Sequence, residues 1–78
     1  MEVEVHVYAH LRKYLKDYQG GGLPVNVPDG ATVGDLLALL GLPEQEAQVV
    51  LVNGLRQDLT HPLQPADRVG IFPIVGGG

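Results

Sequence analysis

The first residues of the chain alternate between apolar and polar side chains. Val3, Val5 and Val7 fall on one side of an extended backbone, and the polar residues between them fall on the other. A period of two is typical of a strand with one buried face. In residues 10–18 the apolar spacing changes to three and four, which predicts a short amphipathic helix. Its apolar side consists of Leu11, Tyr14, Leu15 and Tyr18.

The clearest helical pattern lies in residues 32–40. Thr32 can cap the first turn, and Asp35 stands three residues later, where the acid of a capping box belongs. Gly41 suits the left-handed position that ends a helix, and Pro43 prevents its continuation. The stripe expected to be buried consists of Val33, Leu36, Leu37 and Leu40. This segment is the expected central helix.

Further strands surround that helix in the sequence. The stretch "LPVNVPDG" (residues 23–30) reads as a short strand whose Pro24 and Pro28 suit its ends or an edge position, followed by a turn. The pair Asn53-Gly54 favours a tight turn that joins residues 49–52 to 55–58 as a hairpin. A last strand follows, in which Val69 and Ile71 face the same way. This order predicts an α+β fold, a mixed four- to five-stranded sheet packed on one central helix, as in the β-grasp or ubiquitin-like architecture.

Composition narrows the classes of function. The 78 residues predict a single domain, and nine acidic against five basic residues give a net charge of -4, so a nucleic-acid surface is not expected. The absence of cysteine excludes thiolate chemistry, and the spacing of His6, His10 and His61 matches no common metal site. Asp58 and Asp67 are interpreted as turn residues. Neither a signal peptide nor an apolar run of the roughly 18 residues needed for a membrane span is recognisable, which favours the cytoplasm.

The C-terminal residues are unusual because three glycines follow a hydrophobic strand directly. Glycine loses more conformational entropy on ordering than any other residue, so this segment does not strengthen the fold. The sequence therefore predicts a β-grasp domain over residues 1–73 and a flexible glycine-rich tail over residues 74–78. A flexible end without chemistry is the alternative interpretation.

Three stretches together resemble the MoaD/ThiS family of ubiquitin-like sulfur carriers, and the MoaD branch most closely. They are "PDGATVGDLLALL" at the central helix, "VVLVNG" at the hairpin and "DRVGIFPIVGGG" at the end. Two features depart from the family pattern. Ala66-Asp67 stands where a Gly-Asp pair is common, and three glycines stand where two are usual.

The resemblance implies a chemistry for the last carboxylate. In such carriers an E1-like adenylyltransferase of the MoeB/ThiF type uses ATP to activate it, and it becomes a thiocarboxylate that donates sulfur in molybdenum or tungsten cofactor (molybdopterin) biosynthesis. The sulfur would be carried by Gly78, or by Gly77 if Gly78 is first removed. The chain would be a co-substrate without a bound cofactor, and it would count as the small subunit of molybdopterin synthase when paired with a MoaE-like large subunit.

The residues before the carboxylate have expected roles in docking. Five residues beyond Pro73 extend to about 17 Å, enough to enter a partner's cleft. The predicted partner-binding residues are Phe72, Pro73, Ile74, Val75 and Gly76. Phe72 has two open interpretations, partner docking and core packing. Three other functions also stay open: a ThiS-like carrier for thiamin synthesis, a ubiquitin-like modifier conjugated to lysines, and an interaction module without tail chemistry.

Overall fold

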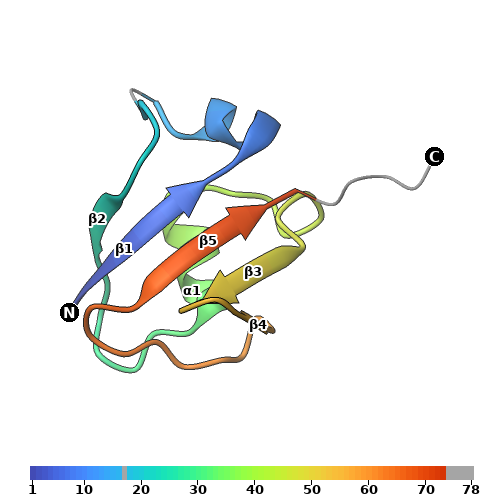
Figure 1. The fold of residues 1–78 in the computed structure, drawn as a ribbon. Coiled ribbons are helices and arrows are strands. Elements are labelled where there is room, and N and C mark those ends of the chain that lie inside the picture. The colour runs from blue at the N-terminus through green and yellow to red at the C-terminus, as the bar shows by residue number, and fades with distance from the viewer. Residues whose placement is uncertain (17, 74–78) are drawn as a thin grey trace.

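The sheet has five strands, and its central strand runs parallel to one neighbour and antiparallel to the other. The computed structural model describes residues 1–16 and 18–73, so the expected tail of residues 74–78 lies outside the described residues (Figure 1). The sheet order is β2-β1-β5-β3-β4, with β1 and β5 parallel and the other neighbouring pairs antiparallel. The strands are β1 (Glu2–Val7), β2 (Leu23–Asn26), β3 (Val49–Val52), β4 (Leu55–Gln57) and β5 (Arg68–Phe72). The predicted mixed β-grasp sheet is confirmed.

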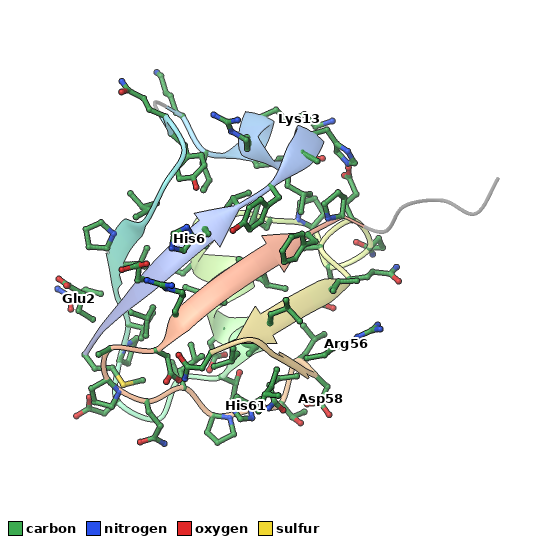
Figure 2. All side chains as sticks on the ribbon, in the orientation of Figure 1. Glu2, His6, Lys13, Arg56, Asp58 and His61 are labelled. Carbon is green, nitrogen blue, oxygen red and sulfur yellow. The ribbon has the colours of Figure 1, made fainter. Side chains whose placement is uncertain are left out.

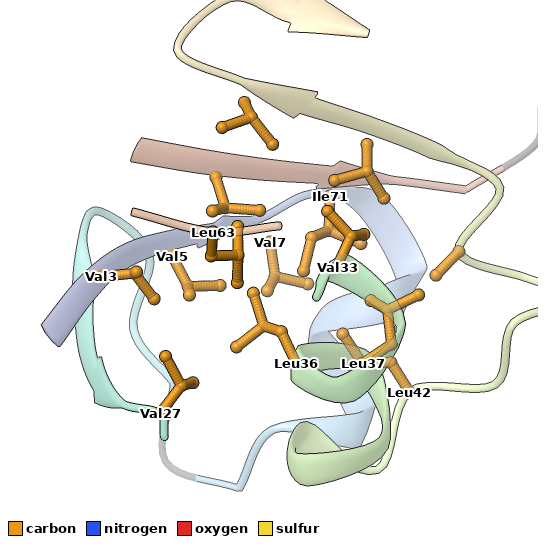
Figure 3. Packing of buried hydrophobic residues seen from close by; sticks show 14 of the residues in the cluster. Val3, Val5, Val7, Val27, Val33, Leu36, Leu37, Leu42, Leu63 and Ile71 are labelled. Carbon is orange, nitrogen blue, oxygen red and sulfur yellow. The ribbon is translucent and has the colours of Figure 1, made fainter. Parts of the chain in front are cut away.

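One face of the sheet, called the inner face here, packs against helix α1 (Val33–Leu40). The alternating valines of β1 and Ile71 of β5 point to this helix (Figure 3), and Val69 of β5 is fully buried. Residues of this core that are exposed by 1% or less include Val3, Val5, Val33, Leu36, Leu37, Val69 and Ile71. Leu40, expected in the buried stripe, is only half-buried at the end of the helix. Among residues 1–16 and 18–73, no α-helix covers the opposite, outer face of the sheet.

Helix α1 has the ends that the sequence predicts. The Thr32 hydroxyl oxygen accepts a hydrogen bond from the Asp35 N–H at 3.2 Å, and the Asp35 carboxylate accepts one from the Thr32 N–H at 3.0 Å. Gly41 adopts the left-handed conformation, with φ 72°. The N–H groups of Val33 and Gly34 donate to the carbonyls of residues 61 and 59. The loop after β4 therefore satisfies first-turn donors that a helix leaves unpaired.

The amphipathic helix expected over residues 10–18 is wrong in type and length. Residues 9–14 form a short 3-10 helix, η1 (Ala9–Tyr14), and its first residue, Ala9, has a left-handed φ of 55°. This short helix is enough to bury Leu11, whereas Tyr18 bonds back to the sheet and to the glycine loop. Because so short a helix gains few hydrogen bonds for the residues it fixes, tertiary contacts decide its form.

The hairpin and the edge strand match the sequence prediction closely. Asn53 and Gly54 have φ angles of 52° and 85°, as a tight type I′ turn requires. β4 ends at Gln57 rather than 58, because the Asp58 carboxylate accepts hydrogen bonds from the N–H and hydroxyl of Thr60 and closes a turn. β2 lies at the sheet edge with Pro24 exposed. Within the described ranges, no helix is long and apolar enough to cross a membrane.

Candidate functional site

The strands β1 and β5 end side by side at one edge of the molecule. They are parallel neighbours in register Val7 to Ile71, and the Tyr8 N–H donates to the Ile71 carbonyl at 3.1 Å. Beyond Phe72 and Pro73 the sequence continues into the glycines. We call this end of the sheet, where Tyr8 follows β1 and Phe72 ends β5, the tail-exit edge.

Two aromatic rings lie against each other at the tail-exit edge. Tyr8 and Phe72 are stacked, with ring centroids 4.3 Å apart and planes within 1°. A Cβ at Gly70 would come within 3.2 Å of the Phe72 ring and 3.6 Å of the Tyr8 ring, so the absence of a side chain there leaves room for the stack. Tyr8 is 42% exposed and Phe72 is partly exposed. Phe72 therefore lies on the outer face and not in the core, which removes one of its two interpretations.

The other expected partner-binding residues divide into two groups. Pro73 is buried, so its effect on a partner would come from the direction it gives the backbone. Ile74, Val75, Gly76, Gly77 and Gly78 lie outside the described residues. Their expected roles stay predictions.

Charged side chains occupy the middle of the same outer face. His6 Nε2 lies 2.5 Å from a carboxylate oxygen of Glu4, and Arg68 Nε donates to the same oxygen at 3.1 Å (Figure 2). The hydrogen bond with His6, and then the charge of Arg68, hold the pKa of Glu4 below its ordinary value of 4.5 although partial burial opposes this. Glu4 is thus paired with two side chains next to the aromatic stack.

The opposite end of β5 is closed by a buried carboxylate. Asp67 is 7% exposed and accepts hydrogen bonds from the Asn53 side-chain amide at 2.9 Å and from the Gln64 N–H at 2.8 Å. The Asn53 side-chain oxygen in turn accepts from the Arg68 N–H at 3.0 Å. Asp67 thus belongs to a turn, as predicted, and it also joins the β3–β4 hairpin to β5. Ala66 beside it has a left-handed φ of 67°, a conformation that glycine adopts more readily than alanine.

A second polar cluster joins η1 to the segment that leads into β3. The Tyr14 hydroxyl donates to the Glu46 carboxylate, and His10 Nε2 lies 3.4 Å from its other oxygen. The hydrogen bond from Tyr14 is the main reason that the pKa of Glu46 is lowered, and the same bond raises the pKa of Tyr14. This cluster fixes η1 beside the tail-exit edge.

Two hollows in the surface are further candidate binding sites. One hollow of about 590 Å³ lies beside β3 and β4, with Glu44, Arg56 and Asp58 in its lining. A smaller hollow of about 270 Å³ lies between η1 and the outer face. In residues 1–16 and 18–73 no group of three His, Asp or Glu side chains could hold a metal ion.

Two contacts of this site could not be predicted from the sequence. The alternation places Tyr8 on the outer face, but nothing local brings it to Phe72. The signal that could have indicated the contact is the position of both rings at the ends of strands that the β-grasp topology makes parallel neighbours. The link between Asn53 and Asp67 was missed for the same reason, since it joins two separate turns.

The fold and this geometry define a ubiquitin-like β-grasp domain whose last strand leads toward a C-terminal glycine segment. The model of the ThiS family matches residues 5–78. The chain belongs to this family of ThiS/MoaD-like ubiquitin-like sulfur carriers. The resemblance found in the sequence is confirmed at this level.

Solved structures show the same relationship. SAMP1 from Haloferax volcanii is 29% identical, with 100% of both chains covered and a TM-score of 0.72. A Pyrococcus furiosus protein that bears the name molybdopterin converting factor, subunit 1, is 25% identical over 96% of this chain and 99% of its own, with a TM-score of 0.73. A complex of subunits 1 and 2 of molybdopterin-converting factor from Helicobacter pylori contains a chain that is 21% identical, covered 100% on both sides, with a TM-score of 0.61. No curated protein matches the chain.

Proposed function

We propose that this chain carries sulfur for molybdenum or tungsten cofactor (molybdopterin) assembly on the carboxylate of Gly78. The observation that carries the proposal is that the ThiS family match continues through residue 78 and thus includes the glycine segment. The fold directs β5 toward that segment at one edge of the sheet. The chain acts as a co-substrate, and its partners hold the catalytic groups.

The proposed chemistry has two balanced steps. A carboxylate is a poor electrophile, so an E1-like adenylyltransferase of the MoeB/ThiF type first joins it to the α-phosphate of ATP and releases pyrophosphate. Hydrosulfide from a sulfur donor then attacks the carbonyl carbon, AMP leaves with the carbon–oxygen bond electrons, and a thiocarboxylate and a proton remain. ATP is consumed by the partner, and its use fits a cytoplasmic location.

The described residues support this role through the geometry of the tail-exit edge. A carrier must present its terminal carboxylate to a buried site while its globular part stays outside. The Tyr8–Phe72 stack offers an exposed aromatic surface next to the point where β5 ends. Buried Pro73 fixes one backbone angle at the start of the segment. We assign partner docking to Phe72, Pro73, Ile74, Val75 and Gly76.

The sulfur acceptor is the finer part of the proposal. The similarity to the Pyrococcus furiosus protein named as molybdopterin converting factor subunit 1 favours a MoaE-like large subunit as second partner. SAMP1 is a comparably similar structure, and a related Haloferax volcanii structure is named small archaeal modifier protein 1. Conjugation of Gly78 to lysines is therefore the second candidate, and a ThiS-like role in thiamin synthesis is the third.

Intact mass spectrometry tests the carrier function. The chain is incubated with ATP, a sulfide donor and the adenylyltransferase encoded in the same genome. We expect a mass increase equal to the difference between sulfur and oxygen, and we expect none for a control chain that lacks Gly77 and Gly78. An unchanged mass of the full chain, with an adenylyltransferase shown to be active, would overturn the proposal. The same spectrum shows whether the loaded chain ends at Gly78 or Gly77.

The acceptor is tested with the loaded chain. We expect sulfur transfer to a pterin precursor only when the MoaE-like subunit is present. Transfer with a thiazole synthase, or Gly-Gly remnants on lysines of cellular proteins, would replace the pterin assignment by one of the two other candidates.

A further inference from the structure

Positive charge in this acidic chain is concentrated beside the tail-exit edge. Three of the five Lys and Arg residues, Arg12, Lys13 and Lys16, lie within one short stretch that also contains a single acid, Asp17. The stretch begins in η1, which follows the end of β1 directly, and Figure 2 shows Lys13 beyond the ends of β1 and β5. The other two cations, Arg56 and Arg68, lie on strands. Even with Glu46, whose carboxylate contacts Tyr14 and His10 of η1, cations outnumber acids here, whereas acids outnumber cations in the chain as a whole.

The smaller hollow lies within this positive region. It has a volume of about 270 Å³ and is lined by Arg12 and Tyr18 on one side and by His6 and Tyr8 of the outer face on the other. We call it the Arg12 pocket. Because Tyr8 also belongs to the aromatic stack, the pocket is continuous with the exposed surface proposed to touch a partner.

Arg12 has a fixed support in this pocket. Its guanidinium carbon lies 5.6 Å from the centre of the Tyr18 ring, a distance at which cation and ring attract. The Tyr18 hydroxyl accepts from the Val7 N–H at 3.1 Å and donates to the Gly21 carbonyl at 2.6 Å, so the ring is held at its far end. A Cβ at Gly20 would lie 3.6 Å from an Arg12 nitrogen, so the glycine loop passes close to the guanidinium.

The charges of the two hollows differ. The larger hollow has Arg56 together with the carboxylates of Glu44 and Asp58 in its lining, so two negative charges outnumber its one positive charge. The Arg12 pocket has Arg12 and no carboxylate among the described residues that line it. Its volume falls below the range of about 300–1,000 Å³ usual for small-molecule sites, but it suits one side chain. A guanidinium recognises a carboxylate with paired hydrogen bonds.

We propose that the Arg12 pocket receives an aspartate or glutamate side chain of the adenylating partner when that partner docks on the tail-exit edge. The proposal rests on the sulfur-carrier function and names the chemistry that its first partner presents. The acidic side chain would pair with Arg12 beside the Tyr8–Phe72 stack. Lys13 and Lys16 would add a longer-range attraction that speeds the encounter.

Neutralising the arginine tests the pocket. We compare Arg12→Gln with Arg56→Gln, a control that removes the same charge at the other hollow, and measure the Kd for the adenylyltransferase from the same genome at low and high salt. We expect Arg12→Gln to weaken binding about tenfold or more and to reduce its salt dependence, as loss of a charged contact should. Arg12→Lys keeps the charge and should recover part of the affinity. The control Arg56→Gln should form the thiocarboxylate at the same rate as the unchanged chain.

Three outcomes distinguish a failure of the pocket proposal from a failure of the carrier function and from a loss of folded protein. Equal affinities of Arg12→Gln and Arg56→Gln, with normal sulfur loading of both, would overturn the pocket and leave the carrier function standing. Failure to load the unchanged chain would overturn the carrier function, and the pocket proposal with it. Thermal unfolding is measured for each variant, because Arg12 also contacts Tyr18; if Arg12→Gln lost affinity only in proportion to lost folded protein, the pocket would be overturned.

Discussion

The two ends of β5 are built for different tasks. At its start, Asp67 is 7% exposed and its carboxylate accepts hydrogen bonds from Asn53 and Gln64. At its end, Phe72 lies on the outer face in a stack with Tyr8, which is 42% exposed. Polar groups are thus buried at one end while aromatic groups are left accessible at the other. The first residues of β5 therefore anchor the strand, and its last residues are accessible to a partner.

This division fits the chemistry proposed for the chain. An exposed aromatic pair adds little to a fold that already buries valines and leucines against α1, but it is a typical centre of a protein interface. A buried carboxylate with satisfied partners, by contrast, stabilises the loops that it joins. Substitutions at the two ends should therefore affect different measurements.

The largest effect on stability is expected at the anchored end. Asp67→Ala leaves the Gln64 N–H and the Asn53 side-chain amide without their acceptor, so the free energy of unfolding should fall by about 2–3 kcal/mol. Urea denaturation measures this change. Asp58→Ala, at an exposed turn acid, is the control and should cost less. At temperatures where Asp67→Ala is folded, its affinity for the adenylyltransferase should be normal; a loss there would mean that the two ends are not separate.

The presenting end should show the opposite pattern. Phe72→Ala removes the aromatic stack and should cost about 1 kcal/mol of stability. Its affinity for the adenylyltransferase, measured by calorimetry, should fall about tenfold or more, because a central aromatic contact is lost. Leu55→Ala is the matched control, since Leu55 is 66% exposed on β4 and away from the tail-exit edge. Equal affinities of the two variants would contradict a docking role for Phe72.

A smaller and stabilising effect is expected beside the anchor. Ala66 has a left-handed φ of 67°, which is unfavourable for a residue with a Cβ. Ala66→Gly should raise the free energy of unfolding by about 0.5–1 kcal/mol after the entropy cost of glycine is included. The same substitution at the exposed helix residue Ala38 should instead lower it by about 1 kcal/mol. If both variants lose stability, backbone strain at Ala66 is not significant.

The smallest effect concerns pH and the outer face between the two ends. His6 and Arg68 lower the pKa of Glu4 below 4.5, so the folded chain binds this proton less readily than the unfolded chain. Glu4 therefore contributes stability at pH above its ordinary pKa, and this contribution is lost as the pH falls through the lowered folded value. Chemical denaturation measures the free energy of unfolding from pH 7 to pH 3. This free energy should fall less for Glu4→Gln than for the unchanged chain. Parallel curves for the two chains would show that the pairing is energetically neutral.

Features that depend on residues close together in the sequence could be predicted, whereas contacts between distant segments could not. The capping box of Thr32 and Asp35, the turn at Asn53-Gly54 and the alternation of β1 each depend on residues a few positions apart, and all three are confirmed. The contact between Tyr8 and Phe72 depends on the pairing of the first strand with the last.

The two remaining differences have the same origin. The link from Asn53 to Asp67 depends on how two turns pack, and no pattern within either turn encodes it. Residues 9–14 have helical spacing, but Tyr18 bonds to the backbone of Val7 and Gly21, and these contacts override a weak local preference. The C-terminal glycines could be proposed as the reactive site only because of the family resemblance and the chemistry of a carboxylate.

The central claim is that the fold presents a terminal carboxylate as the sulfur-carrying group. Tandem mass spectrometry of the chain, after incubation with ATP, a sulfide donor and the adenylyltransferase, tests this most directly because fragmentation locates the added mass. We expect the sulfur-for-oxygen mass difference in every fragment that contains the terminal glycine, and in no fragment that lacks it. Sulfur located elsewhere, or a chain that stays at its original mass with an active adenylyltransferase, would contradict the claim.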